Sequence, residues 1–118
     1  MVWDMKTVID FCYLSEGDMT RGTTPTLRFH IKGIEVKDIE KAFVTIRQIK
    51  KVLTKSIEDI QIDDENNVLS CELSQEETLY FENGQVELQI RIITKAGKVL
   101  ATPVKTTTMQ KILLDEVI

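Results

Sequence analysis

Few side chains in this sequence have the chemistry of a catalyst, and they are scattered. His30 is the only histidine among the 118 residues. It falls at an outward position of an alternating stretch, between Arg28 and Lys32. A nucleophilic site needs a serine or cysteine within hydrogen-bond reach of an imidazole, and no recognisable motif places one beside His30. We therefore predict a surface or rim histidine, no catalytic residue and no enzymatic activity.

The acidic run at 63–67 and the glycines are the next candidates, for metal and nucleotide binding. Asp63, Asp64 and Glu65 offer oxygen ligands, but the run lacks the central glycine and the terminal bidentate glutamate of a twelve-residue calcium loop. A solvated hairpin turn is the simpler interpretation. The five glycines are scattered rather than grouped into a phosphate-binding loop. We predict no cofactor and no metal ion.

The two cysteines, Cys12 and Cys71, have neither the number of a disulfide framework nor the spacing of metal ligands. Cys71 alternates in phase with Leu69 and Leu73, which predicts an inward position on a strand. We expect both thiols to be reduced and buried.

Charge excludes some classes of partner. The net charge is −4, whereas a dedicated nucleic-acid binder usually carries a basic face to replace phosphate counterions. No apolar run approaches the roughly 18 residues that would span a bilayer. A short basic cluster, Arg47, Lys50, Lys51 and Lys55, directly precedes the acidic residues 58–65. We predict that these charges face each other on adjacent antiparallel strands; the alternative is a basic stripe for an acidic partner.

Aromatic residues make up only 6% of the chain. Trp3 and Tyr80 would be the candidates for a platform on which a sugar ring stacks. With so few rings, we favour the interpretation that Tyr80 lies at the rim of the core beside Phe81.

The elements that position these side chains are predicted by alternation. Over 85–94, Val86, Leu88, Ile90 and Ile92 point to one side and polar residues to the other, which indicates a strand with one buried face. A strand at 25–32 has the same pattern. The predicted core consists of the inward residues of these and neighbouring strands: Leu27, Phe29, Ile31, Val44, Ile46, Leu69, Cys71, Leu88, Ile90 and Ile92.

Turn and capping signals connect the remaining elements. Residues 34–42 predict an irregular crossover or one helical turn before a strand at 42–50, and 51–56 predict its returning hairpin arm or an extension of it. A further strand at 57–62 has Ile60 and Ile62 in phase. Ser74 and Glu77 have capping-box spacing, so 74–81 should form one helical turn that crosses between the sheets and buries Leu79 and Phe81.

The last predicted strand, 99–108, follows a tight turn at 95–98 and is interrupted by Pro103, which indicates an edge strand or a bulge. The total is about seven strands with turns every 8–12 residues. That pattern is typical of an all-β, antiparallel, immunoglobulin-like sandwich.

The first twenty residues differ from the rest. They lack the basic region and cleavage site of a signal peptide, and the alternating pattern begins only after them. One explanation is an assigned start that lies too early, with Met19 as the true initiator. The other is a genuine N-terminal strand or helix whose Val8, Ile9, Phe11 and Tyr13 dock on the domain. We treat 1–20 as an extension and 21–118 as the single domain, and we expect a chain without residues 1–18 to fold.

Five segments carry a resemblance to a known family. They are RGTTPTLRFHI at 21–31, VTIRQ at 44–48, LSQEETLYF at 73–81, VELQIRIITKAGKVLAT at 86–102 and ILLDEVI at 112–118. In this order they resemble small prophage-encoded β-sandwich proteins of Gram-positive bacteria, and the first strand is similar to the N-terminal domain of phage upper baseplate proteins.

The resemblance implies a non-catalytic structural or tail (baseplate) assembly protein of a phage or prophage, made in the bacterial host cytoplasm and incorporated into the virion. Its partners would be other phage structural proteins, or further copies of itself as a homo-oligomer. The alternative is a carbohydrate- or receptor-binding module at the phage tail tip. The resemblance transfers no binding residues, although the first strand, with its threonines Thr23, Thr24 and Thr26, is our candidate for docking, since Pro103 limits pairing at another edge.

Overall fold

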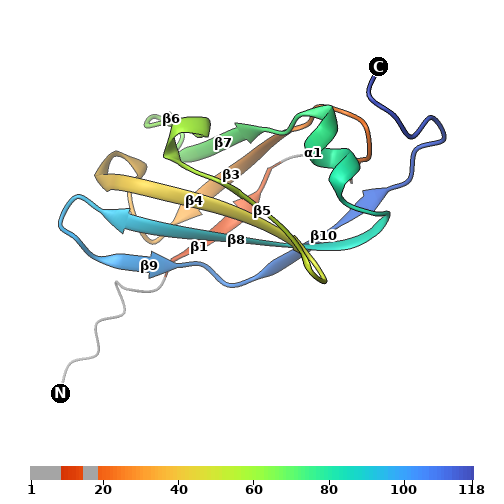
Figure 1. Ribbon diagram of the computed structural model, residues 1–118. Helices are drawn as coiled ribbons and strands as arrows, with labels where there is room; N and C mark the ends of the chain where they lie inside the picture. The colour runs from red at the N-terminus through yellow and green to blue at the C-terminus, as the bar shows by residue number, and fades with distance from the viewer. Residues whose placement is uncertain (1–8, 15–18) are drawn as a thin grey trace.

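Two β-sheets pack face to face in this computed structural model, which describes residues 9–14 and 19–118 (Figure 1). One sheet has the strand order β1-β3-β7-β6. The other has the order β2-β10-β8-β4-β5, and β9 also pairs with β8. The strands are β1 Asp10–Tyr13, β2 Met19–Thr20, β3 Thr26–Lys32, β4 Ile39–Gln48, β5 Lys51–Lys55, β6 Gln61–Asp63, β7 Val68–Glu72, β8 Gly84–Thr94, β9 Val99–Ala101 and β10 Lys105–Gln110. The predicted all-β sandwich is confirmed.

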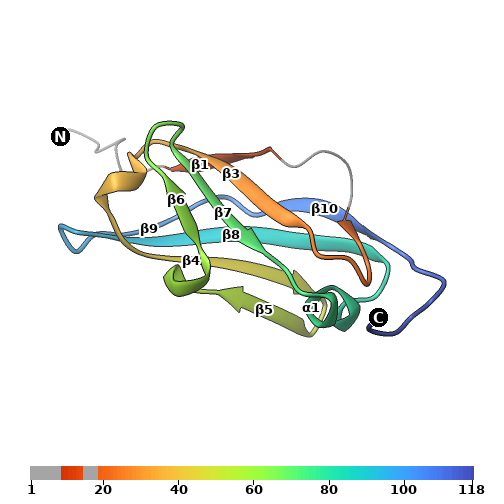
Figure 2. The same cartoon turned by 90° about the horizontal axis from the view of Figure 1, so that it is seen from above.

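The core lies between the inner faces of the two sheets. All ten residues predicted to form it are buried, because the period of two places every second side chain of β3, β4, β7 and β8 on the inner face. Phe11 adds an edge-to-face contact with Phe29, with ring centroids 5.3 Å apart. The molecule measures 56 × 27 × 22 Å along its principal axes, and the long strands β4 and β8 run along its length (Figure 2).

The first strand lies inside the segment that we set apart as an extension. β1 pairs with β3 in antiparallel register, and Ile9 and Phe11 are 1% and 0% exposed. Met19, 2% exposed, begins β2, which pairs in parallel with β10. For residues 9–13 the alternative of a docked N-terminal strand is therefore the observed one, and the boundary at residue 21 does not separate these residues from the core. Val8 lies outside the described residues.

The capping box was predicted correctly and the buried face of its helix was not. The Ser74 hydroxyl accepts the Glu77 backbone N–H, and the Glu77 carboxylate accepts the Ser74 N–H, at the start of α1 (Gln75–Tyr80). Phe81 is buried as expected, whereas Leu79 is only half-buried. The fully buried helix residue is Thr78, because its hydroxyl bonds to the backbone of the loop that precedes β3.

The middle of the chain agrees with the prediction except at residues 57–62. The arm at 51–55 does return as a hairpin on β4. Residues 57–59 form a 3₁₀ turn rather than strand, so only Ile60 is buried and Ile62 is 41% exposed on the short edge strand β6. A second 3₁₀ turn, Val36–Asp38, forms the crossover before β4.

Pro103 lies at a bulge, one of the two predicted alternatives. Ala101 faces Arg91 and Lys105 faces Leu88, so four steps along this strand match three along β8. Thr102 is 3% exposed at the break, and its hydroxyl accepts the backbone N–H of Ile90 at 3.1 Å. Two N-terminal strands and this division of the last strand account for ten strands among residues 9–14 and 19–118, instead of the seven predicted.

Candidate functional site

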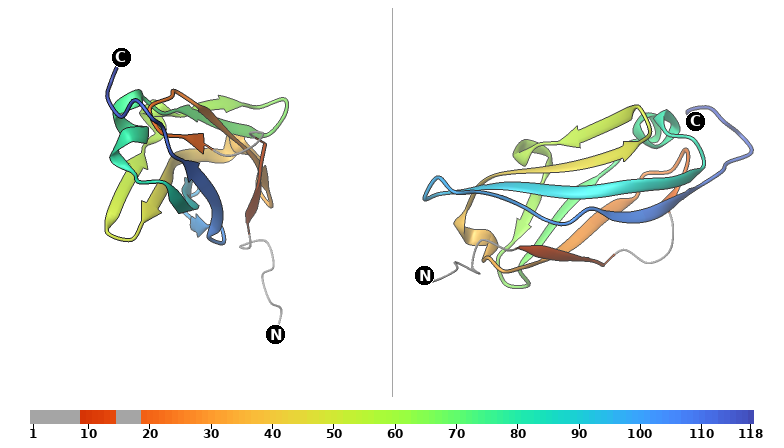
Figure 3. Two further views of the ribbon diagram at one scale, coloured as in Figure 1. Left: turned by 90° about the vertical axis from the view of Figure 1, so that its right-hand side faces the viewer. Right: turned by 90° about the horizontal axis from the view of Figure 1, so that it is seen from below.

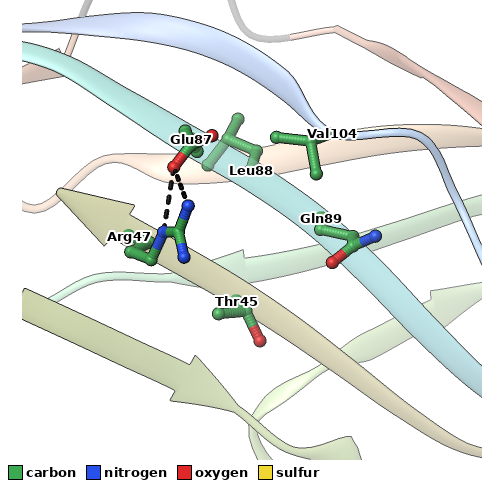
Figure 4. A pocket seen from close by; sticks show the side chains of 6 residues that line it. All are labelled: Thr45, Arg47, Glu87, Leu88, Gln89 and Val104. Carbon is green, nitrogen blue, oxygen red and sulfur yellow. Dashed lines mark hydrogen bonds and ion pairs between the residues drawn. The ribbon is translucent and has the colours of Figure 1, made fainter. Parts of the chain in front are cut away.

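Three of the hollows on the described surface are candidates for ligand binding. The first lies on the outer face of the six-stranded sheet and has a volume of about 190 Å³; it is lined by Thr45, Arg47, Glu87, Leu88, Gln89 and Val104 (Figure 4). The Arg47 Nε and Nη2 atoms both lie within 2.9 Å of Glu87 Oε1. These two charges satisfy each other, so the hollow presents mainly hydroxyl, amide and aliphatic groups to a ligand.

The second hollow, of about 330 Å³, opens between the edges of the two sheets near β5 and β7. Lys55 Nζ lies 2.7 Å from Glu77 Oε2, with side chains 13% and 23% exposed. Burial alone would raise the pKa of Glu77, but hydrogen bonds from Lys55 and the Ser74 N–H outweigh it and hold that pKa below the usual value. Burial raises the pKa of the Cys71 thiol to about 11, so this thiol is protonated and unreactive at neutral pH.

The third hollow is an open groove of about 560 Å³ between β5 and α1. Val52, Leu53 and Tyr80 provide its apolar surface, and Glu76 and Glu77 lie along its rim. Tyr80 is 45% exposed, and its ring centroid lies 5.2 Å from that of Phe81, which confirms the rim position predicted for it. Trp3, the other half of the predicted platform, lies outside the described residues.

β1 brings together two residues that sequence analysis treated separately. His30 on β3 lies directly opposite Cys12 on β1, and both are half-buried on the outer face of the four-stranded sheet. The expectation of a rim histidine is confirmed. The expectation that Cys12 is buried is wrong, because Phe11 occupies the inward position of β1 and alternation turns the next side chain outward.

Side chains of the acidic run at 63–67 make hydrogen bonds within the protein. Asp63 accepts hydrogen bonds from the Asn66 side chain and backbone at 2.8 and 3.2 Å, and these lower the pKa of that carboxyl. Asn67 has a φ of 55° and connects the turn to the loop after β3: its amide group donates to the carbonyls of Ile31 and Ile34 and accepts from the Val36 N–H. The predicted solvated turn is confirmed, and Asn67 also has a structural role.

The predicted pairing of the basic cluster with residues 58–65 is wrong. β5 belongs to the six-stranded sheet and β6 to the four-stranded sheet, so the two segments are not adjacent strands. Arg47 pairs instead with Glu87 and Lys55 with Glu77, while Lys51 Nζ lies 5.6 Å from the centroid of the Tyr80 ring.

The first predicted strand is not a free edge. β3 lies between β1 and β7, so its backbone groups are already paired on both sides. The described edges are β1 and β6 in one sheet and, in the other, β5 and the side formed by β9, β10 and the short β2. Lys105 links two of them, because its Nζ lies 3.0 Å from Asp10 Oδ1 and donates to the Phe11 carbonyl.

Exposed hydrophobic side chains gather at one end of the molecule, a feature that the sequence analysis missed. Eleven large hydrophobic residues of the described chain are exposed. Seven of them lie at the β4–β5 hairpin, on α1 or in the tail after β10: Ile49, Val52, Tyr80, Leu113, Leu114, Val117 and Ile118. We call these seven the apolar end. The hairpin tip, α1 and the C-terminal tail lie together at one end of the long axis (Figures 2 and 3).

Comparison with known proteins gives no assignment: no protein-family model matches this chain, and neither does any curated protein. Within residues 9–14 and 19–118, no group of three or more histidine, cysteine, aspartate or glutamate side chains is placed to hold a metal ion. Over the same residues, no helix has the length and apolar character needed to cross a membrane.

Proposed function

We propose that this chain is a non-catalytic structural or assembly protein of a phage or prophage tail that acts through protein–protein contacts. The observation that carries the proposal is the apolar end. Monomeric proteins rarely leave several large hydrophobic side chains exposed in one region unless that region binds something. The tail segment ILLDEVI, one of the five segments of the family resemblance, supplies four of its seven residues.

We further propose that the sandwich is immunoglobulin-like, on the basis of its strand order. In that fold the sheets have the orders A-B-E-D and G-F-C, with C′ added beside C in variable-type domains. The orders β1-β3-β7-β6 and β10-β8-β4-β5 match them strand for strand, and β2 adds to the second sheet beside β10. Such sandwiches present edges, faces and ends to partners, while function depends on which surface is used.

The other parts of the proposal follow from the family resemblance. The protein would be made in the host cytoplasm and incorporated into the virion. Its partners would be other tail proteins or further copies of itself, with no role for nucleic acid, membrane or cofactor. Four of the five resembling segments fall, in sequence order, on β3, β4, α1 and the β8–β9 hairpin, and the fifth forms the tail after β10.

Mass spectrometry of gradient-purified particles from the induced prophage tests the proposal. We expect peptides of this chain at a stoichiometry comparable with other tail proteins, and a host cytoplasmic enzyme measured in the same sample controls for carry-over. Absence from particles and from tail-assembly intermediates would count decisively against it.

A receptor- or carbohydrate-binding module is the second candidate, and the groove between β5 and α1 favours it. The half-exposed Tyr80 ring beside Glu76 offers both a stacking surface and hydrogen-bond acceptors, as sugar sites do. Binding of the purified chain to host cell-wall polysaccharide, lost in Tyr80→Ala and kept in the control Val99→Ser, would favour this candidate.

A further inference from the structure

The tip of the β4–β5 hairpin is a rigid, strained projection. Ile49 is 87% exposed with a φ of 54°, a backbone conformation that a β-branched residue adopts only at an energetic cost. The neighbouring Gln48 holds the tip in place: its amide donates to the Glu82 carbonyl and accepts the Glu82 N–H, both at 2.7 Å. A bulky apolar group is thus presented to solvent where glycine would be less strained.

The tail exposes apolar side chains although contacts with its own domain hold its backbone in place. Arg21 Nη2 lies 3.0 Å from Asp115 Oδ1, and the Gln75 amide group makes two hydrogen bonds to the backbone of Ile118. Yet Leu113 and Ile118 are 92% and 85% exposed. The contacts of the tail with its own domain therefore fix its path without covering its hydrophobic side chains.

The tip and the tail have opposite charges. Lys50 and Lys51 follow Ile49 at the tip, whereas Asp115 and Glu116 lie among the apolar residues of the tail. Because the whole chain carries a net charge of −4, the positive charge at the tip is a local feature. α1 lies between the tip and the tail of the same molecule (Figure 1; Figure 3, left).

We propose that the apolar end joins two copies of this chain, with the tail of each lying on the hairpin tip of the other. This rests on the proposed function and names self-association as its mode. Since tip and tail lie at the same end, a two-fold axis through that end brings both tails onto both tips at once. The contact is then isologous and closed, and it yields a dimer rather than a fibre. Each contact pairs apolar with apolar groups, and at the tip it places the acidic residues of the tail near Lys50 and Lys51.

Sedimentation equilibrium of the 118-residue chain over a range of concentrations tests this directly. We expect a weak, reversible dimer with a dissociation constant in the micromolar range. Ile49→Gly at the tip, and Leu113→Ser with Leu114→Ser in the tail, should each raise that constant at least about tenfold. The matched control replaces two hydrophobic residues outside the apolar end, Val99→Ser with Val104→Ser, which are 55% and 50% exposed, and should leave the constant unchanged.

The tip variant keeps the test independent of folding. Glycine suits a φ of 54°, so Ile49→Gly should melt at the same temperature as the parent chain or higher while it dimerises less. A charge exchange adds a second check: Lys50→Glu should weaken the dimer, and Glu116→Lys in the same chain should restore it.

Mixing the tip variant with the tail variant separates tail-on-tip pairing from other arrangements. In a homodimer of either variant, both contacts are damaged. In a mixed dimer, the intact tail of the tip variant meets the intact tip of the tail variant, so one contact of two survives. We therefore expect mixed dimers to form more tightly than either variant alone. Tail-on-tail packing predicts no such recovery.

A chain that stays monomeric at the highest concentrations, a dimer indifferent to the tip and tail variants, or a mixture without recovery would each overturn the inference. Its failure is distinguishable from that of the proposed function. A monomer found in purified particles overturns only the dimer, and a dimer absent from particles overturns only the tail assignment.

Discussion

Leu88 lies in the middle of β8, is 1% exposed, and faces Ile46 across the sheet. Its truncation to alanine removes apolar contacts from both inner faces and leaves a cavity. We expect Leu88→Ala to lower the free energy of unfolding by roughly 2–5 kcal/mol, measured by urea titration. The exposed Thr106→Ala on β10 is the control and should change stability by less than about 0.5 kcal/mol. Equal effects of the two would mean that the inner face has been misassigned.

Glu77 should make stability depend on pH. Its pKa is lowered in the folded state because the bonds from Lys55 and Ser74 outweigh burial, so in acid the unfolded chain takes up the proton more readily. The contribution is present above the ordinary pKa of 4.5 and is lost as pH falls through the lower folded value. We expect Glu77→Gln, which still fits the capping box, to flatten the fall in melting temperature between about pH 5 and about pH 3, a range that begins just above the ordinary pKa and extends below it. If the melting temperature of the variant fell with acid pH as steeply as that of the parent chain, this prediction would be contradicted.

Two substitutions of Asn67 can separate the contribution of its hydrogen bonds to stability from the contribution of its backbone conformation. Asn67→Gly removes three side-chain bonds but tolerates the φ of 55°, whereas Asn67→Ala removes the bonds and is strained. We expect alanine to cost about 1 kcal/mol more than glycine, measured by chemical denaturation. If the two variants have the same stability, the left-handed backbone contributes nothing to this turn.

For single residues, the sequence predicted burial better than it predicted ion-pair partners. Alternation alone identified Leu27, Phe29 and Ile90 as core residues, because the inner face of a strand is a local property. The partners of Lys55 could not be predicted in the same way. They depend on which sheet β5 and β6 join, and that is decided by contacts between distant segments.

Among the secondary-structure elements, β1 is the one whose contribution to stability can be tested most directly, by shortening the chain. Ile9 and Phe11 are almost fully buried, so a chain that begins at Met19 should lose roughly 3–6 kcal/mol, taking about 1.5–3 kcal/mol for each large apolar side chain. The sequence alone predicted only that such a chain would still fold. Thermal melts followed by circular dichroism would measure it, and a chain that begins at Ile9 retains β1 and is the control. If the two shortened chains were equally stable, β1 would be dispensable.

Elements with local signals were predictable and those without them were not. Ser74 and Glu77 identify α1 because their bonds close within one turn, and the β4–β5 hairpin follows from its short connection. β1 and β2 have no comparable signal, since each is only a few residues long and gains its partner from β3 or from β10.

For the molecule as a whole, the sheet order predicts how strongly each strand is protected against amide hydrogen exchange. Amides of β3, β7, β4 and β8 are paired on both sides, whereas β5 and β6 are edges. In dilute solution we expect hydrogen exchange to be slowest in the four inner strands and faster in β5 and β6, as measured residue by residue by NMR. At concentrations where the dimer forms, protection should rise at the β4–β5 tip and in the tail. Uniform exchange across both sheets would contradict this order.

The apolar end could not have been predicted from the sequence, although every residue in it is visible there. Alternation indicates which side chains enter a core, and an exposed Ile49 at a turn or an exposed Leu113 in a tail belongs to no periodic pattern. The feature exists only because the fold brings the hairpin tip and the tail to one end (Figure 2). Residue patterns were therefore enough to predict the fold class. The candidate surface could be identified only from the three-dimensional arrangement.

The extra residue at the bulge makes the stretch around Pro103 intolerant of length changes, although it looks like a permissive linker. Before it, Leu100 points inward; after it, Met109 is again fully buried, nine positions later and hence out of phase for a continuous strand. Deleting one residue between Thr102 and Lys105 would either turn Met109 to the outer face or pull β10 out of register with β8. Natural variation in this segment should consist of substitutions, with insertions and deletions confined to true loops such as the turn at 95–98.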